Sequence, residues 1–554
     1  MALFVLAAGL LCGSGRLWGN TQTVVAVTPN QEIQLTLESR NASASPTSEI
    51  YVVNGRASAH IGDLVALMGS HGLFFYASDG VGPHQGGSGL IARDDVVLLK
   101  INEEWPCRGG TNTDVLKELI QVIVDHPDGF IGEIVVADNG QWQGSMDWPE
   151  SNAEDITQST QDVVDLFSPN YNVSTYSWIP IRGTEVDEYV DGDMADGYRL
   201  YDTADPETGI HVSYPKFQTT FGTRISFKNG IWNGTGYERR LKVINLPVLK
   251  SHGSYGVTAS LKHYMGVQSQ GEGGGGLANG HSTIATGGMG TLMVETGLPT
   301  LNIIDAIWVN ANPPSSPFDG PSTPYSHATR VNVLLASIDP VALDYWAAKH
   351  VLSQAATLIG YTDIHSIDPD NTNKSGVSNA AFGVWLKLTK DEIIAGGHHA
   401  TTEETHMNIY VKSEGMPPEI GVPSQTPPKD QVMTGNTVKV SVTVTDADDG
   451  VKNVTLSYTI NNGTAWNHQT MTLNASTGLY EATIPSQEPG ICVKFKIVAY
   501  DAAGQVATRD GNDPACTYQV IPEFPSFLIT ALLVLLTLAA ILLLKKKTRL
   551  ASRT

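Results

Sequence analysis

The fold is decided by residues 96–140, which read VVLLKINEEWPCRGGTNTDVLKELIQVIVDHPDGFIGEIVVADNG. The run at 96–99 is short and wholly apolar, as in a strand buried on both faces, and a second such run follows at 134–137. Between them, Asn112 or Thr113 can cap a helix. The apolar residues of that helix recur at helical spacing, at Val115, Leu116, Leu119, Ile120 and Ile123. The stretch therefore predicts a strand, a helix and a second strand, the unit from which parallel sheets are built.

The same pattern returns later in the chain. Further strands are expected at 241–245, 301–307 and 331–336. A helix follows the last of them, with Asp339 as its cap and Pro340 at its first position. The sequence thus predicts an α/β fold, with a mainly parallel sheet and helices on its faces.

This α/β domain is expected at residues 94–415, after an N-terminal extension at 20–93. Its residues 141–240 are polar, aromatic and irregular in pattern, and 271–276 form a glycine-rich loop. We interpret both segments as insertions over the edge of the sheet.

A proline-rich linker at 416–429 ends the α/β domain. Segments rich in Val and Thr, with period-two alternation, follow it at 437–445, 454–460, 479–484 and 493–500. That spacing predicts a small all-β sandwich of immunoglobulin or fibronectin type over residues 430–520.

Both ends of the chain carry apolar runs. Residues 1–19 have the apolar core and small residues of a secretory signal peptide. Residues 527–544 carry no charge, and a helix of that length is about 27 Å long, just enough to cross a bilayer as one transmembrane helix. The basic tail at 545–554 favours a cytoplasmic C-terminus. The sequence therefore predicts a single-pass protein of the cell membrane with its bulk outside the cell.

The chain is acidic, with a formal net charge of −22. Because nucleic acids are polyanions, we expect no nucleic-acid partner, and the charge suits an exposed surface domain with other surface proteins as possible partners. Asn-x-Ser/Thr acceptors agree with an exported glycoprotein; they lie at Asn41, Asn172, Asn233, Asn373, Asn453, Asn462 and Asn474.

Four cysteines are too few for a disulfide scaffold, and Cys12 lies in the expected signal peptide. Cys492 and Cys516 both fall in the last folded segment and are candidates for a disulfide in an oxidising compartment. The sequence leaves the bridge and two separate thiols equally open, and Cys107 has no neighbouring cysteine.

No metal site is assigned from the residues, and the cofactor stays unknown. His399, Glu403 and His406 have the spacing of one helix face, which would suit a metal. However, Gly396 and Gly397 end the helix that precedes them.

In open α/β sheets, ligands bind beyond the carboxyl ends of the strands. Polar residues collect there in this sequence, and the candidate ligand-binding residues on this rim are Lys100, Asn102, Asp138, Asp305 and Asp339.

The densest stretch is 246–266, reading LPVLKSHGSYGVTASLKHYMG. Lys250 and His252 enter a glycine-containing turn, and a helix is expected to start near Thr258, which shares a face with Lys262. The helix N-terminus with Lys250 and His252 predicts a cradle for a carboxylate or phosphate. Lys250 and His252 are the candidate catalytic residues, with His252 as a general acid or base near neutral pH. The alternative is that the lysines are solvated charges and His252 caps a turn.

This signature resembles that of the domain of unknown function 362 family, and VVLLKIN, GGTNTDVLKELIQVI and VNVLLASIDPVALDYWAAKHV resemble other parts of the family in the same order. The resemblance covers roughly 94–352. It implies that Lys100, Lys250, His252, Lys262 and His281 line a site, with His281 assigned because a histidine commonly follows the family's lysine-rich helix. The family has no agreed activity. Many members carry an iron–sulfur domain with clustered cysteines, which this chain lacks.

The string PEFP at 522–525, ahead of an apolar helix and a lysine cluster, resembles an archaeal C-terminal sorting signal. The resemblance implies an archaeal host and a helix that is cut near Pro525 and replaced by a lipid.

We therefore interpret the chain as a membrane-anchored extracytoplasmic protein whose α/β domain binds a small anionic ligand. Whether it is an enzyme stays open. One alternative is a surface recognition or structural protein without catalysis. A second alternative is a redox partner whose iron–sulfur cluster is supplied by another chain.

Overall fold

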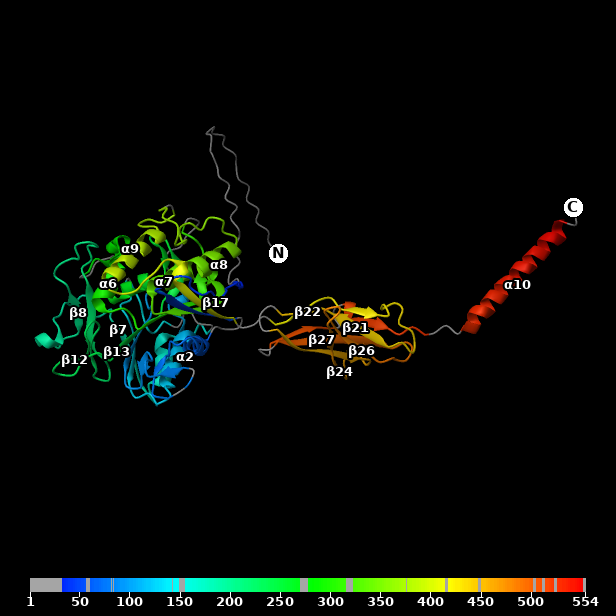
Figure 1. Ribbon diagram of the computed structural model, residues 1–554, viewed down its shortest axis with the longest axis horizontal. Helices are drawn as coiled ribbons and strands as arrows, with labels where there is room; N and C mark the ends of the chain where they lie inside the picture. Colours follow the sequence, from blue (N-terminus) through cyan, green and yellow to red (C-terminus); the bar gives the residue numbers. More distant parts are fainter. Residues whose placement is uncertain are drawn as a thin grey trace, which may run out of the picture. The chain divides into compact units, whose positions relative to one another are not determined.

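A computed structural model describes residues 32–55, 60–80, 82, 84–141, 143–148, 155–269, 278–314, 322–374, 376–413, 417–446, 450–501, 505–510, 514–522 and 526–551. The chain divides into two compact units, Met1–Lys412 and Ser413–Thr554 (Figure 1). The predicted signal peptide and the glycine-rich loop at 271–276 lie outside the described residues, as does most of the PEFP string.

The first unit is built on one large sheet, which has ten strands within the described residues. Eight lie in the order β18 (Met407–Ser413), β1 (Ser48–Asn54), β17 (Thr329–Ser337), β16 (Leu301–Asn310), β13 (Leu241–Asn245), β5 (Val96–Lys100), β6 (Glu133–Asp138) and β7 (Asn172–Ser177). The other two, β14 (Val248–His252) and β15 (Gly256–Thr258), form a hairpin that joins the sheet through β16. The strands from β16 through β13, β5 and β6 to β7 pair in parallel, so the predicted mainly parallel sheet is confirmed.

The stretch that opened the sequence analysis folds as predicted. β5 and β6 pair in parallel, and α2 (Thr113–Val124) connects them. The Asn112 side chain caps α2 by accepting hydrogen bonds from the backbone N–H groups of Asp114 and Val115. The later strands and α7 (Pro340–Trp346), which Asp339 caps, also lie where the pattern placed them.

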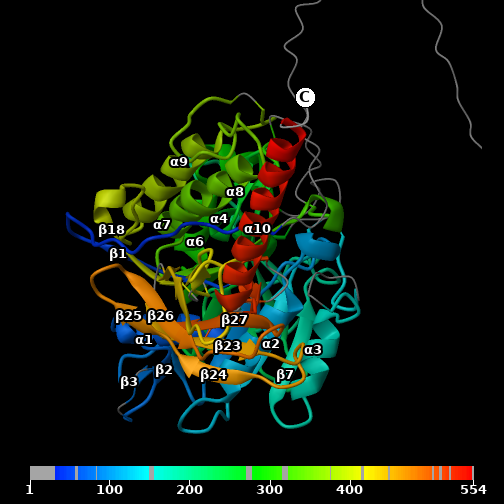
Figure 2. The same cartoon turned by 90° about the vertical axis from the view of Figure 1, so that its right-hand side faces the viewer.

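Helices cover both faces of the sheet (Figures 1 and 2). One core holds side chains of α1 (Ile61–Ser70), α2 and α3 (Thr160–Phe167). The opposite core holds those of α4 (Ser260–His263), α6 (Gly288–Thr296), α7, α8 (Ser353–Leu358) and α9 (Phe382–Ala395). Within β5, Val97 and Leu99 face the first core whereas Leu98 faces the second, the alternation expected of a strand.

The direction of one strand, β17, is not indicated by any pattern in the sequence. β17 pairs antiparallel with both β16 and β1. Its carboxyl end, and therefore Asp339, lies at the opposite edge of the sheet from the carboxyl ends of β5 and β6. The prediction that Asp339 belongs to the same rim is wrong for this reason.

The two segments treated as additions to the domain contribute to its main sheet. Residues 20–93 supply β1 and α1, together with a small sheet of β3 (Gln85–Gly86), β2 (Tyr76–Ala77) and β4 (Ile91–Ala92). Residues 141–240 supply α3 and β7. They also form an antiparallel sheet of β12 (Tyr237–Glu238), β11 (Gly230–Trp232), β10 (Arg224–Ser226), β9 (Ser213–Gln218) and β8 (Gly197–Leu200).

The second unit contains antiparallel sheets around one hydrophobic core. One has the order β20 (Ser424–Thr426), β21 (Val438–Val442), β26 (Leu479–Ile484) and β25 (Thr472–Asn474). The other has the order β24 (Asn467–Thr470), β23 (Val451–Thr459), β27 (Cys492–Asp501) and β28 (Val506–Arg509), with β29 (Thr517–Gln519) also on β27. β19 (Glu419–Ile420) and β22 (Val444–Thr445) form a further pair. The immunoglobulin or fibronectin type stays a prediction.

The candidate disulfide between Cys492 and Cys516 does not form in this structure. Cys492 lies opposite Gln519 in the β27–β29 pair, whereas Cys516 ends the 3-10 helix Pro514–Cys516, three residues before Gln519, and is not opposite Cys492. A disulfide needs Cα atoms within about 7 Å. The Cys492 Sγ instead lies 3.7 Å from the Thr517 Oγ1.

The chain ends in a long helix, α10 (Ser526–Ala551). Within the part of the chain whose side chains the structure describes, which in α10 is residues 530–546, no helix is long and apolar enough to cross a membrane.

Candidate functional site

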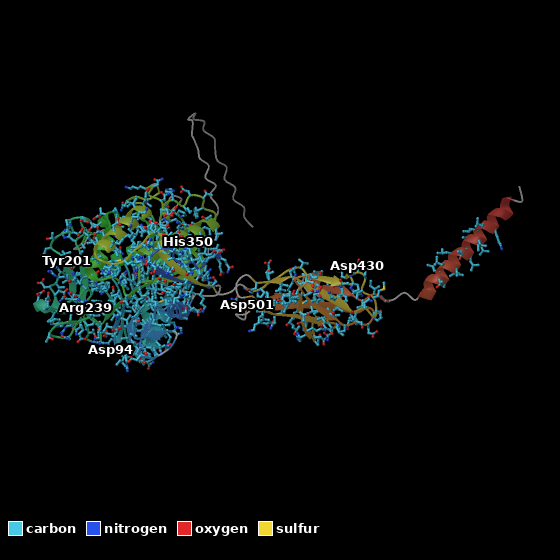
Figure 3. All side chains as sticks on the ribbon, in the orientation of Figure 1. Asp94, Tyr201, Arg239, His350, Asp430 and Asp501 are labelled. Carbon is cyan, nitrogen blue, oxygen red and sulfur yellow. The ribbon has the colours of Figure 1, made fainter. Side chains whose placement is uncertain are left out.

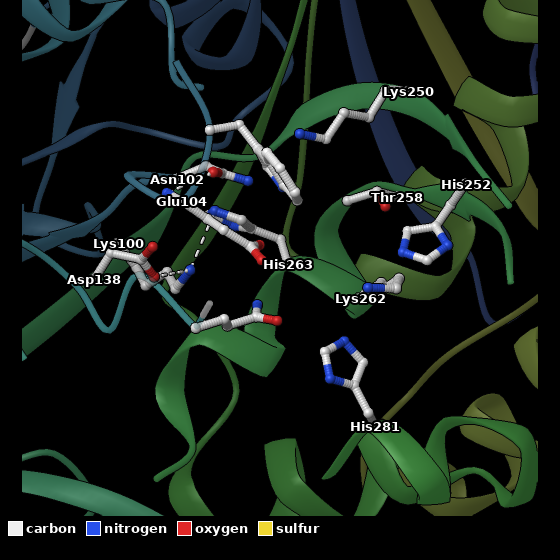
Figure 4. Close-up of a pocket in the computed structure, with 12 residues that line it drawn as sticks. Lys100, Asn102, Glu104, Asp138, Lys250, His252, Thr258, Lys262, His263 and His281 are labelled. Atoms are coloured by element: carbon white, nitrogen blue, oxygen red, sulfur yellow. Dashed lines mark hydrogen bonds and ion pairs between the residues drawn. The ribbon is translucent and has the colours of Figure 1, made fainter. Parts of the chain in front are cut away.

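A cavity of about 290 Å³ opens beyond the carboxyl ends of β5 and β6 (Figure 4). It brings together eight of the ten ligand-binding and catalytic residues predicted from the sequence, namely Lys100, Asn102, Asp138, Lys250, His252, Thr258, Lys262 and His281. Four further residues complete its lining, namely Glu104, Trp105, Gln141 and His263.

The β14–β15 hairpin delivers three of the lining residues. Lys250 and His252 alternate with Ser251 along β14, so they project from the same face of the strand into the cavity. Thr258 pairs with Lys250 across the hairpin. A helix does start near Thr258, at Ser260, but Thr258 itself ends a strand, so the prediction that Thr258 shares a helix face with Lys262 is wrong.

The predicted anion cradle at this helix N-terminus is already occupied by the protein. The backbone N–H groups of Ser260 and Leu261 donate to the two carboxylate oxygens of Asp344, at 2.7 and 2.9 Å. Burial raises the pKa of Asp344 to about 7. A ligand must therefore be held by side chains rather than by the first amides of α4.

Lys100 and Asp138 form a buried ion pair at one end of the cavity, with 2.6 Å between the Lys100 Nζ and the Asp138 Oδ1 (Figure 4). The Lys100 ammonium also donates to the Ile101 carbonyl at 3.0 Å and contacts the His263 Nε2 at 3.2 Å. An ammonium has three hydrogens, and these three acceptors use all of them. Lys100 is thus fully engaged within the protein.

The tautomer of His263 follows from its neighbours. Asn245 donates from its amide nitrogen to the Ser260 carbonyl and to Asn302, which fixes its Oδ1 as the atom facing His263. The His263 Nδ1 therefore donates to that oxygen, at 2.8 Å, and its Nε2 accepts from Lys100. Burial and the nearby Lys100 and Lys250 hold the pKa of His263 well below its usual range, which agrees with a neutral ring.

Lys250 and Lys262 have no such carboxylate contact within the described residues. The Lys250 Nζ donates to the backbone carbonyl of Gly109. Burial lowers the pKa of Lys250 to about 7; Glu104 opposes this shift, and the cations of Lys262 and Lys100 add to it. Burial likewise lowers the pKa of Lys262 to about 8, with Glu104 opposing it.

Glu104 is the acid that balances these lysines. Burial raises its pKa to about 6, although the cations of Lys262 and Lys250 act in the opposite direction. The site therefore contains one carboxyl and two amines whose proton affinities lie within a narrow range around neutral pH.

The two remaining histidines are neutral at pH 7. The His252 Nδ1 accepts a hydrogen bond from the backbone N–H of Ser254 at 3.0 Å, so its Nε2 carries the proton. Burial, with Lys262 and His281 nearby, holds the pKa of His252 well below its usual range. Burial and Lys262 lower the pKa of His281 to about 3. The expectation that His252 titrates near neutral pH is therefore wrong.

Asp305 and Asp339 do not line the cavity. Asp305 accepts from the backbone N–H groups of Asn112 and Ile307, so it joins the start of α2 to β16. Asp339 accepts from the first amides of α7, from the Ser48 hydroxyl and from the Thr401 N–H. Both are structural, buried carboxyl groups whose pKa burial raises, that of Asp305 to about 6.

The sequence analysis missed Glu104, Trp105, Gln141 and His263. Glu104 and Trp105 lie in the loop between β5 and α2, whose path no periodicity describes. His263 lies in the stretch 246–266, directly after Lys262. Its position in that stretch was the signal that could have identified it as a site residue.

No group of three or more His, Cys, Asp or Glu residues that could hold a metal ion is present among the residues that the structure describes. An iron–sulfur cluster would need about four cysteine ligands. The described cysteines are Cys107 in the first unit and Cys492 and Cys516 in the second, so this donor set does not fit such a cluster.

Comparison with known proteins supports the family resemblance over part of the chain. Residues 238–349 match the model of a family described as "Domain of unknown function (DUF362)". That segment contains the hairpin and α4, and with them Lys250, His252 and Lys262. No curated protein matches the chain. A solved structure titled "Crystal structure of Br derivative BhCBM56" is similar over 16% of this chain and 83% of its own, at 20% identity and a TM-score of 0.13.

The ion pair depends on a glycine next to it, which gives a first prediction. A Cβ at Gly266 would lie 2.2 Å from the Asp138 Oδ1 and 2.3 Å from the Lys100 Nζ. We expect Gly266→Ala to lower the free energy of unfolding by about 1–3 kcal/mol, as overpacked cores do, measured by urea denaturation. The matched control is Gly62→Ala in α1, where an added Cβ meets nothing within 4 Å. Equal stability of the two variants would contradict the close approach.

Proposed function

We propose that the cavity binds a small carboxylate or phosphate, and that Lys262 is the residue that holds it. The observation that supports this proposal is that Lys262 is almost buried and has no acceptor for its ammonium in the part of the chain that the structure describes. Its side chain lines the cavity and is only 5% exposed, yet its ammonium has no hydrogen-bond or ion-pair partner within the described residues; the Tyr255 ring centroid lies 5.8 Å away. A buried, unpaired ammonium is costly, and an anion in the cavity would supply the missing acceptor.

The charge balance of the cavity supports an anionic ligand. Lys100 is neutralised by Asp138. Lys250 and Lys262 then face Glu104 as the one remaining carboxyl of the lining. This positive charge is concentrated in a protein of net charge −22, whose exposed acids include Asp94 and Asp430 (Figure 3).

Neutral donors next to Lys262 support the same ligand. The His252 Nε2 carries a proton, and the Thr258 Oγ1 is buried without a hydrogen-bond partner in the described structure. Around Lys262, Figure 4 shows His252, His281 and Thr258. A volume of about 290 Å³ lies at the lower limit of typical ligand pockets, roughly 300–1,000 Å³, so the ligand is a small molecule.

A substitution tests the role of Lys262. We expect Lys262→Met to weaken the binding of oxalate and of inorganic phosphate about ten- to hundredfold, since a hydrogen bond to a charged group contributes about 1.5–3 kcal/mol. The measurement is isothermal titration calorimetry on the full chain at pH 7. Methionine keeps the apolar stem and removes a buried charge, so the fold is preserved.

The matched control is Lys117→Met, which removes an exposed lysine from α2. It should bind both anions as the unsubstituted protein does. If neither anion binds the unsubstituted chain, the proposal fails, and a surface recognition or structural role becomes the better hypothesis. Iron and sulfide in the purified protein would instead favour the redox alternative.

The affinity for these anions should fall as the pH rises. An anion favours the protonated forms of Lys250 and Lys262, whose pKa values lie at about 7 and about 8, so binding takes up protons in this range. Lys100 keeps its ion pair with Asp138, and burial and Lys262 hold the pKa values of His252 and His281 below this range. We expect affinity to decrease from pH 6 to pH 9, with calorimetric proton uptake in buffers of different ionisation enthalpy. A pH-independent affinity would contradict the assignment.

We also propose that the protein is displayed outside the cell and is held to the membrane by its C-terminal segment. Support comes from the uncharged run at 527–544 and the basic tail at 545–554. The full chain should sediment with membranes, whereas a chain ending at residue 522 should stay in the supernatant after ultracentrifugation. Recovery of the full chain in the supernatant would refute the anchor, and loss of the peptide at 545–547 from membrane-bound protein would indicate processing.

A further inference from the structure

We propose that Lys250 is a nucleophilic amine that condenses with the carbonyl carbon of a small 2-oxo acid, whose carboxylate is held by Lys262. This inference rests on the proposed anion site and adds a substrate class and a covalent step to it. It concerns a residue that anion binding alone leaves without a distinct role.

The structure separates the three lysines of the cavity by their partners. Lys100 has a carboxylate at 2.6 Å, which ties its ammonium into an ion pair and raises its pKa, although burial lowers that pKa by more. Lys250 is fully buried on β14, and its described hydrogen bond goes to a neutral backbone carbonyl, that of Gly109. Losing a proton therefore breaks no ion pair at Lys250, whose side chain belongs to the lining of the cavity.

Burial favours the neutral amine at Lys250. The cations of Lys262 and Lys100 lower its pKa, while Glu104 and Asp138 raise it, and burial is the largest effect. A lysine desolvated beside another cation is a recognised way to make an amine nucleophilic at neutral pH. Burial lowers the pKa of Lys250 further, to about 7, than that of Lys262, to about 8.

Glu104 can complete the condensation. The neutral Lys250 amine attacks the carbonyl carbon, the new N–C bond forms, and one proton passes from nitrogen to the former carbonyl oxygen to give a carbinolamine. Loss of water then breaks the C–O bond, the nitrogen lone pair forms the C=N bond, and a proton from the Glu104 carboxyl joins the leaving oxygen. The products are a protonated imine and one water, and no oxidant or reductant is needed. Burial raises the pKa of Glu104 to about 6, so part of this carboxyl still carries a proton just below neutral pH.

The three groups enter the same cavity from separate elements (Figure 4). Lys250 comes from β14, Lys262 from α4, and Glu104 from the loop after β5. In a 2-oxo acid the carboxylate and the reacting carbonyl are on adjacent carbons, so a compact cavity with an anion-holding lysine and a separate amine suits this class.

Reductive trapping tests the inference. The full chain is incubated with 2-oxopropanoate and sodium cyanoborohydride at pH 7.5, digested, and mapped by mass spectrometry. We expect one reduced adduct, on Lys250, and none on Lys100 or Lys262. The matched probe is 2-hydroxypropanoate, which has the same carboxylate without a carbonyl, and it should bind and leave no adduct. An adduct distributed over surface lysines, or none on Lys250, would overturn the inference.

Two variants separate this inference from the anion site. Lys250→Met should lose the adduct and still bind oxalate within about tenfold of the unsubstituted affinity. Lys262→Met should weaken oxalate binding and slow adduct formation by the same factor. Oxalate binding with no Lys250 adduct in the unsubstituted chain would overturn the covalent step alone, whereas absence of both would overturn the anion site as well. Because the adduct is mapped in the unsubstituted protein, the test does not depend on how the variants fold.

The pH profile gives an independent readout. The trapping rate should be highest between about pH 6 and pH 7, where neutral Lys250 and protonated Glu104 coexist, and should fall further above about pH 8 as Lys262 loses its charge. In Glu104→Gln the carboxyl is replaced by an amide that cannot deliver a proton, so the rate should fall about tenfold or more. A rate that rises steadily to pH 10 would show an ordinary lysine and overturn the inference.

Discussion

The buried ion pair between Lys100 and Asp138 determines the character of the site. It joins the ends of β5 and β6, adjacent parallel strands of the main sheet. Two buried charges are stable only when each is also hydrogen-bonded. Here the Lys100 ammonium donates to the Ile101 carbonyl and to His263, and the Asp138 carboxylate accepts from the backbone N–H of Glu103. Because the charges of Lys100 and Asp138 compensate each other, the remaining charge of the cavity belongs to Lys250, Lys262 and Glu104.

Strand direction explains which predicted residues reach the site. The carboxyl ends of parallel strands meet at one edge of a sheet, and β5 and β6 place Lys100 and Asp138 there. β17 runs in the opposite direction, so Asp339 at its end stabilises α7 instead. Lys250 reaches the cavity from an added hairpin rather than from a strand end of the main sheet. The site is thus formed by two different structural features, the carboxyl ends of parallel strands and the β14–β15 hairpin.

Much of the fold was predictable because burial leaves a periodic record in the sequence. The strands, the Asn112 cap and the Asp339 cap could all be located in this way. Eight cavity residues followed from the strand-end rule and the family signature. Strand direction leaves no such record, which is why β17 was misjudged. The four-residue helix α4 depends on Asp344, 84 residues away from Ser260, and a local pattern cannot contain that contact. Proton affinities were also out of reach, because they depend on burial and neighbours that only the folded chain defines.

Lys250 and Lys262 also restrict the charge of a ligand that allows Lys250 to react. An anion raises the pKa of every cation near it, so a dianion such as phosphate would keep both Lys250 and Lys262 protonated. A single carboxylate paired with Lys262 has its charge largely compensated there, and Lys250 can then lose its proton. Binding strength and reactivity therefore favour different ligands in one cavity. Phosphate should bind without reaction, and a monocarboxylate is the anion that leaves the amine of Lys250 available.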